Sequence, residues 1–111
     1  MIMENLGSVR VAPNVLATIA YLTALAVPGV ARMADDLVSG VTRLIGRDTP
    51  ASGVRLQVKD GVVQVELHVV VKGGSSMLEV GKRIQEDVSE ALTRMVGMPV
   101  SEVNVFIQDV E

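Results

Sequence analysis

The chain has 111 residues, of which 49% are hydrophobic and 21% charged, and its formal net charge is −3. This length fits one domain with one core, and the apolar fraction is too high for a disordered chain. The acidic balance argues against a nucleic-acid module, which normally carries a basic surface to neutralise phosphates. The sequence has no cysteine, which excludes a disulfide framework, a thiolate zinc site and a cysteine nucleophile. The composition therefore favours a small intracellular interaction domain over an enzyme.

An uncharged segment near the N-terminus has to be weighed as a membrane span. Residues 11–31 carry no charge, and they are about as many as a bilayer core requires. Pro13 and the Pro28-Gly29 pair shorten the helical part, and alanine, which gains little on transfer to lipid, supplies much of its apolar character. Residues 1–5 lack the basic region of a secretory signal. We therefore expect a buried or interface helix and no membrane span.

The first half of the chain is predicted to hold one strand and two helices. Residues 7–11 alternate between small or apolar and polar side chains, which indicates a short strand. A helix begins at Pro13, where the missing N–H costs nothing, and runs to about Ala26. A second, shorter helix is predicted over Asp35–Gly46, with acidic residues near its positive end. Residues 46–53 are predicted to form a flexible loop.

The clearest pattern is a hairpin in the second half. Residues 54–59 and 62–72 alternate between apolar and polar side chains, as strands with one buried face do. They are joined by Asp60-Gly61, a dipeptide typical of a two-residue turn because glycine accepts a positive φ. We expect the longer strand to lie in the interior of the sheet.

A long helix and a last strand complete the predicted fold. Ser76 and Glu79 have the spacing of a capping box, and the helix that they begin ends at Gly97, before Pro99. Residues 102–108 alternate again, with Val103, Val105 and Ile107 directed inward. The order β-α-β-β-α-β predicts an α+β two-layer sandwich in the ferredoxin-like split βαβ plan, with two helices on one face of a four-stranded sheet.

With its elements in this order, the sequence resembles the bacterial alkaline shock protein family of small envelope stress response proteins. The resemblance covers nearly the whole chain, and the joint order of its short pieces is more specific than any one of them. The pieces are Gly7-x-Val9-x-Val11-Ala12-Pro13, Ile19-Ala20, Val27-x-Gly29-Val30, Gly53-Val54, the Asp60-Gly61 hairpin with its valine-rich strand, Glu79-Val80, Ile84-Gln85, Val88, Met95, Gly97 and Val103-Asn104-Val105.

The resemblance implies a non-enzymatic cytoplasmic protein that associates with itself and serves cell-envelope homeostasis. Some members of the family lie against the membrane through a small membrane-anchored partner, so the resemblance implies a peripheral place at the inner face of the cell membrane. The sequence departs from the family pattern at Asn14, Ala17 and Thr18, in the Met77-Leu78 start of the long helix, and at Lys72-Gly73-Gly74. These departures bear on the identity of the partner more than on the fold.

The helix at residues 13–26 is the strongest candidate for an interaction surface. We expect Val15, Ile19 and Leu22 to fill the core, yet a second face of this helix is also uncharged. A helix that is apolar all round is normally buried all round, and a single sheet covers only one side. We therefore predict an oligomer; the alternative, an alanine-rich outer face tolerated in water, stays open. The candidate interface residues are Leu16, Ala20, Thr23 and Val27 on this helix, and Val70 and Phe106 on the outward face of the sheet.

No pattern in the sequence points to a cofactor, a metal or catalysis. His68, the one histidine, is expected to be solvated or at an interface, because Glu66 and Gln64 make a poor set of further ligands. Residues 73–76 could hold an anion through free amides, but they lack the lysine and the spacing of a P-loop. A loop with a helix cap is therefore favoured there. No nucleophile lies at a plausible spacing from a base, and we expect no enzymatic activity.

These patterns predict a structural or interaction protein of the bacterial cell-envelope stress response. An RNA- or ribosome-associated α/β module and a regulatory partner of a lipid-metabolism enzyme remain as alternatives. The acidic balance predicts no retention on RNA at physiological salt, and co-purification distinguishes the second alternative.

Overall fold

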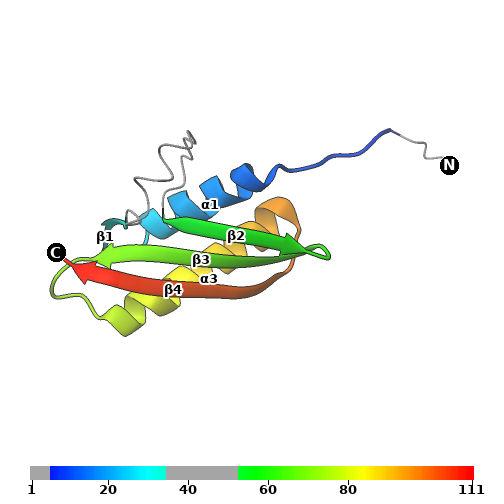
Figure 1. Ribbon diagram of the computed structural model, residues 1–111. Helices are drawn as coiled ribbons and strands as arrows, with labels where there is room; N and C mark the ends of the chain where they lie inside the picture. The colour runs from blue at the N-terminus through cyan, green and yellow to red at the C-terminus, as the bar shows by residue number, and fades with distance from the viewer. Residues whose placement is uncertain (1–5, 35–52) are drawn as a thin grey trace, which may run out of the picture.

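The computed structural model describes residues 6–34 and 53–111. Within these ranges two helices lie together on one face of a four-stranded sheet (Figure 1). The predicted α+β class with two layers is confirmed. The helix predicted over Asp35–Gly46 and all but the last residue of the loop predicted at 46–53 lie outside the described residues. In chain order the elements are α1 (Pro13–Leu25), β1 (Val30–Met33), β2 (Val54–Lys59), β3 (Val62–Val71), α3 (Met77–Val96) and β4 (Val100–Val110).

The first strand lies elsewhere than the sequence pattern predicted. Residues 7–11 join no strand of the described sheet, and Val9 is 94% exposed. This segment runs away from the body of the molecule (Figure 1). The chain enters the sheet only at β1, so that the first strand follows α1 instead of preceding it. Alternation shows which side chains can share a face, but a strand also needs a free edge beside it, and β1 is the segment that pairs with β3.

β3 is the central strand of the sheet. It pairs in parallel with β4 along one side, and on the other side it pairs antiparallel with β1 at residues 69–71 and with β2 at residues 62–67. β1 and β2 therefore lie end to end along the same edge of β3 (Figure 1). The side chains of β3 that point toward the helices are almost completely buried: Val63, Val65, Leu67, Val69 and Val71.

β1 and β2 together form one edge strand that is interrupted at a single point opposite His68. The Ala34 N–H donates to the His68 carbonyl oxygen at 2.8 Å, and the His68 N–H donates to the Gly53 carbonyl oxygen at 2.9 Å. The ladder thus continues across the place where the chain leaves the sheet and returns to it. Gly53 has a φ of +83°, and a Cβ built on it would lie 2.8 Å from the Ala34 oxygen and 3.0 Å from the His68 oxygen. Glycine is the residue that fits this position.

The hairpin and the long helix agree with their sequence signals. Lys59 pairs with Val62 across the two-residue turn, and both turn residues have positive φ, as a type I′ turn requires. The Ser76 hydroxyl accepts from the Glu79 N–H at 3.3 Å, and α3 ends at Gly97 in the left-handed conformation. The last strand extends two residues beyond the predicted range at each end.

Gly53→Ala tests the close approach at the interruption. The alanine is expected to cost about 1–2 kcal/mol for the left-handed backbone conformation, and further free energy because two backbone oxygens crowd its methyl group. Gly61→Ala is the matched control, since Gly61 also has a positive φ but nothing lies within 4 Å of its built Cβ. In urea unfolding, Gly53→Ala should lose at least about 1 kcal/mol more stability than Gly61→Ala. Equal losses would contradict the close approach.

Candidate interaction surface on α1

α1 is a helix without a charged side chain. Its 13 residues begin with Pro13 in the first turn, and the first and last turns hold no acidic or basic residue. The Thr18 hydroxyl donates to the Asn14 carbonyl oxygen at 2.8 Å, and the Thr23 hydroxyl donates to the Ile19 carbonyl oxygen at 2.7 Å. Because the helix itself satisfies these hydroxyl donors, its threonines place little demand on water. The surface of α1 is therefore apolar to a degree unusual for a helix at the edge of a small domain.

The face of α1 that packs into the core is the one predicted to be the interface. Leu16 is 1% exposed, and Ala20 and Val27 are likewise buried, so the prediction of these three residues as interface residues is wrong. Thr23 is half-buried. The alanines on this side, Ala20 and Ala24, lie in the same core cluster as the inward side chains of β3. Small side chains let a helix approach its neighbours closely, which explains why the alanine-rich side faces inward.

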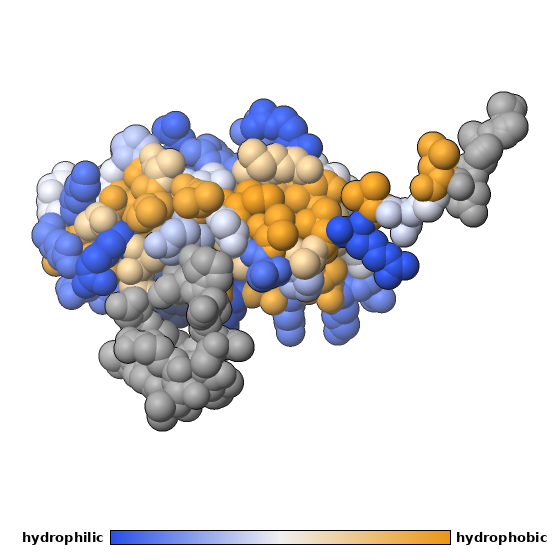
Figure 2. All heavy atoms as spheres, turned by 90° about the horizontal axis from the view of Figure 1, so that it is seen from above, coloured by the Kyte–Doolittle hydropathy of each residue, from blue (hydrophilic) through white to orange (hydrophobic). Residues whose placement is uncertain are grey.

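The opposite side of α1 is exposed and apolar. Val15 is 46% exposed and Leu22 57%, although both were predicted to fill the core. Ile19, the third of that set, is half-buried, and Leu25 is exposed. Figure 2 looks down on this side of the molecule and shows apolar side chains gathered over α1. Spacings of three or four residues align these positions along the helix, and we call Val15, Ile19, Leu22 and Leu25 the outer stripe of α1.

α1 is too short to cross a bilayer. At about 1.5 Å per residue, its 13 residues span roughly 20 Å, whereas a hydrocarbon core is about 30 Å thick. Over residues 6–34 and 53–111 there is no helix with the length and apolar character of a membrane span.

The two sheet residues predicted as interface residues have different environments. Val70 is 2% exposed, so its prediction as an interface residue is wrong; its register partners Arg32 of β1 and Asp109 of β4 flank it on both sides. Phe106 is exposed, and its ring stacks on His68 with the ring centroids 4.9 Å apart. Alternation identified the sheet face of both residues correctly, but the neighbouring strands decide which of them water reaches.

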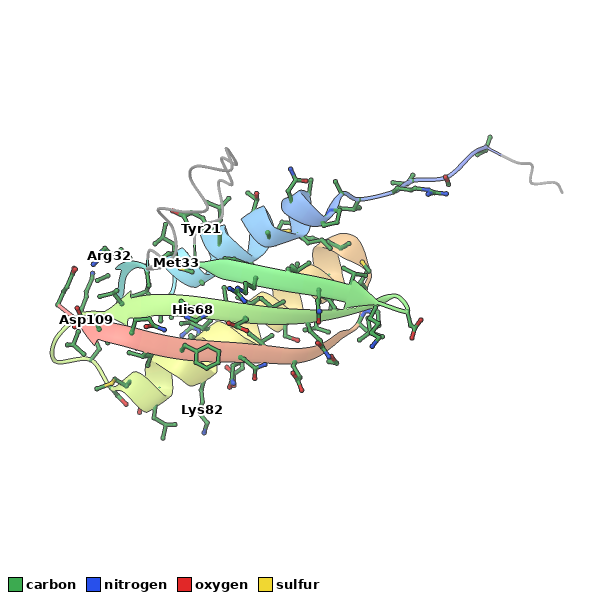
Figure 3. All side chains as sticks on the ribbon, in the orientation of Figure 1. Tyr21, Arg32, Met33, His68, Lys82 and Asp109 are labelled. Carbon is green, nitrogen blue, oxygen red and sulfur yellow. The ribbon has the colours of Figure 1, made fainter. Side chains whose placement is uncertain are left out.

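His68, on β3 (Figure 3), contacts three side chains of the same chain. Its Nε2 lies 2.7 Å from Glu66 Oε2, and its Nδ1 lies 2.8 Å from Gln108 Nε2, while one side of its ring stacks on Phe106. Both ring nitrogens thus have a partner within the chain. Among the described residues there is also no group of three or more histidine, aspartate or glutamate side chains that could hold a metal ion.

The glycine-serine segment before α3 uses its backbone within the fold. The Gly73 N–H donates to the Glu111 carbonyl oxygen at 2.6 Å, and the Ser75 N–H donates to the Lys72 carbonyl oxygen at 3.1 Å. Ser76 caps α3. These contacts agree with a loop that ends in a helix cap.

Solved structures share this fold. One variant of the MamM CTD superposes with a TM-score of 0.56, over 90% of this chain and 100% of that chain, at 13% sequence identity. Another MamM CTD variant has a TM-score of 0.53, over 87% of this chain and 94% of that chain, also at 13% identity. At this level of identity the likeness concerns the fold alone.

Sequence relatives cover nearly the whole chain. The YqhY protein of Bacillus subtilis is 30% identical over 107 residues, which are 96% of this chain and 79% of YqhY. The YloU protein of the same organism is 23% identical over 106 residues, which are 94% of this chain and 88% of YloU. The sequence model of the alkaline shock protein 23 family, described as having a cell envelope-related function, matches residues 1–111. The chain therefore belongs to the alkaline shock protein 23 family, as the resemblance in its sequence predicted, and its function is cell envelope-related.

Proposed function

We propose that this protein is a non-enzymatic interaction protein of the bacterial envelope stress response, which associates with itself through the outer stripe of α1. In the cell it lies at the inner face of the membrane, docked on a membrane-anchored protein partner. Membership in a cell envelope-related family supports the setting. The surface of α1 supports the mode of action.

The observation that carries the proposal is that α1 is uncharged on its exposed side as well as on its buried side. A helix that covers one face of a sheet needs one apolar stripe, and its other side is normally charged. Here the outer stripe presents Val15 and Leu22 to water at about half of their full exposure. A second copy that packs its own outer stripe against this one covers Val15 and Leu22, and no charged side chain of α1 has to lose its water.

The energies allow such a contact and limit its strength. In a two-fold dimer, three exposed side chains from each copy, each about half exposed, contribute roughly 5–9 kcal/mol when they are covered. The loss of translational and rotational freedom costs about 4–15 kcal/mol. The two ranges overlap, so this contact favours an association that depends on concentration in place of a permanent dimer. A partner at the membrane surface strengthens the assembly by raising the local concentration.

The absence of enzymatic activity is part of the proposal. It is supported by the lack of a nucleophile at a plausible spacing from a base in the sequence, and by His68, whose two ring nitrogens already contact Glu66 and Gln108.

Leu22→Glu tests the outer stripe. The carboxylate would have to be buried at the proposed contact, so the weight-average mass measured by light scattering should fall below that of the wild type at every concentration up to high micromolar. Met95→Glu is the control, because Met95 is also exposed but lies at the C-terminal end of α3. Both variants should unfold in urea within about 0.5 kcal/mol of the wild type, as exposed substitutions generally do. A wild type that is strictly monomeric, or a Leu22→Glu variant with the mass of the wild type, would refute the contact.

Fractionation of native cells tests the membrane partner. The protein should sediment with membranes and be released by alkaline carbonate without detergent, as a peripheral protein held by another protein is. Cross-linking before lysis should capture a protein that needs detergent for extraction. Recovery of the whole population in the cytosolic fraction, with no cross-linked membrane protein, would contradict this part of the proposal.

A further inference from the structure

The segment before α1 has the pattern of a strand but pairs with no strand of the described sheet. We call residues 8–12 the N-terminal arm. Val9 and Val11 lie on one side of an extended arm and Ser8 and Arg10 on the other, since side chains alternate along extended backbone. Val9 is 94% exposed, and the arm runs away from the body of the molecule (Figure 1). The arm thus presents Val9 almost fully to water, whereas Val11, next to α1, is 40% exposed.

β4 is a strand with one open side. It pairs with β3 along one edge, and within the described residues no strand pairs with its other edge. β4 has 11 residues, and along them the Val103 carbonyl oxygen already accepts from Gln85 Nε2 at 3.1 Å. Unpaired N–H and C=O groups along such an edge form a template for a further strand.

An apolar groove runs beside this open edge. It lies between α3 and β4 and is mainly but not wholly apolar: α3 contributes Met77, Leu78, Gly81, Lys82 and Gln85, and β4 contributes Val105 and Ile107. Leu78 is 71% exposed, and Met77 is exposed as well. Val105 and Ile107 point toward the helix layer but are only half-buried, because no strand among the described residues covers them from the open side. A strand added to β4 would bury these side chains.

Gly81 lies in the interior of α3, where glycine weakens a helix relative to alanine. A Cβ built on Gly81 meets no heavy atom within 4 Å, so no contact within the described chain requires glycine at this position. The residue also lines the groove. Its lack of a side chain leaves room for another chain to approach the helix closely.

We propose that the N-terminal arm of one copy adds as a strand to the open edge of β4 of a second copy. Val9 and Val11 then lie in the groove beside Gly81, and Arg10 lies on the opposite face of the extended sheet. Charge complementarity supports this occupant: β4 carries Glu102 and Asp109 and no basic residue, whereas the arm carries Arg10 and no acidic residue. Backbone hydrogen bonds and alternate side chains are the usual means of recognition in strand addition.

The arrangement of the layers favours a second copy over the arm's own β4. α1 packs on β1, β2 and α3, and α3 packs on β4. The arm is joined to the start of α1, so α3 lies between the arm and the groove of the same chain. The arm also points away from the body of the molecule (Figure 1).

This contact joins two different surfaces, the arm and the edge, and each copy has both. Such a head-to-tail contact continues from copy to copy, whereas the outer stripe of α1 joins identical surfaces and closes as a pair. The two contacts are independent, and the proposal does not rest on the one at α1.

A complementation experiment tests the arm contact, with Leu22→Glu in every protein so that the α1 contact is removed. The first variant carries Gly81→Gln, which fills the groove but keeps the arm. The second carries Val9→Asp and Val11→Asp, which keep the groove but would place two carboxylates against its apolar side chains. Each variant alone should be monomeric by light scattering. An equimolar mixture should give a heterodimer of twice the monomer mass and nothing larger, because it holds one functional arm and one functional edge.

Two controls separate this contact from other effects. Thr93→Gln, at an exposed position of α3 outside the groove, should assemble as the Leu22→Glu parent does. Gly81→Gln should unfold at a urea concentration no lower than that of the parent, so that its loss of assembly is not a loss of fold. In the heterodimer, amide hydrogen exchange in residues 8–11 of the Gly81→Gln copy should be slower than in the monomer.

Three outcomes would overturn the arm contact: a monomeric Leu22→Glu parent at high micromolar concentration, a mixture that stays monomeric, or a heterodimer whose arm amides exchange as fast as in the monomer. A failure of the α1 contact gives a different result, an unchanged mass on introducing Leu22→Glu into the wild type. The experiments therefore distinguish a failure of the arm contact from a failure of the α1 contact.

Discussion

Every other element of the described fold is positioned by β3. Both of its edges are hydrogen-bonded, to β4 on one side and to β1 and β2 on the other, and its inward valines and Leu67 form the floor on which both helices pack. A shift of the register by one residue would turn this apolar row toward water, so the pairing is tightly specified. Because both helices lie on the same side of β3, the outward face of the sheet stays polar and the far side of α1 is left uncovered. The exposed surface of α1 is thus a consequence of a two-layer fold with an apolar helix in its second layer.

Local signals made the second half of the fold predictable from the sequence. A turn dipeptide between two alternating runs specifies the hairpin, and a serine cap and a terminal glycine bound α3, so neighbouring residues alone determine these elements. β1 has no such signal, since four residues with a register shift after Val30 show no clean alternation. The segment at 7–11 has the alternation and pairs with no edge of the described sheet. Pairing over long distances along the sequence decided both cases.

The candidate surface was predictable as a helix but not in its residues. The sequence shows that α1 is uncharged, and this sufficed to select it as an interaction element. A helix without a polar side, however, has no feature that sets its rotation about its own axis. The choice of Leu16 and Ala20 for the core, over Val15 and Leu22, came from the close packing of alanines against neighbouring elements, which periodicity does not report. The sequence shows that Gly81 is a glycine in the interior of a predicted helix. Only the groove that it lines suggests why a glycine stands at this position.

The interruption of the edge strand at His68 has a consequence for how this scaffold tolerates change. The backbone groups of one residue hold both Ala34 and Gly53, so the chain that connects them starts and finishes at adjoining points of an intact sheet. A disturbance of the His68 backbone would therefore loosen both halves of the edge strand at once, although β1 and β2 are far apart along the chain.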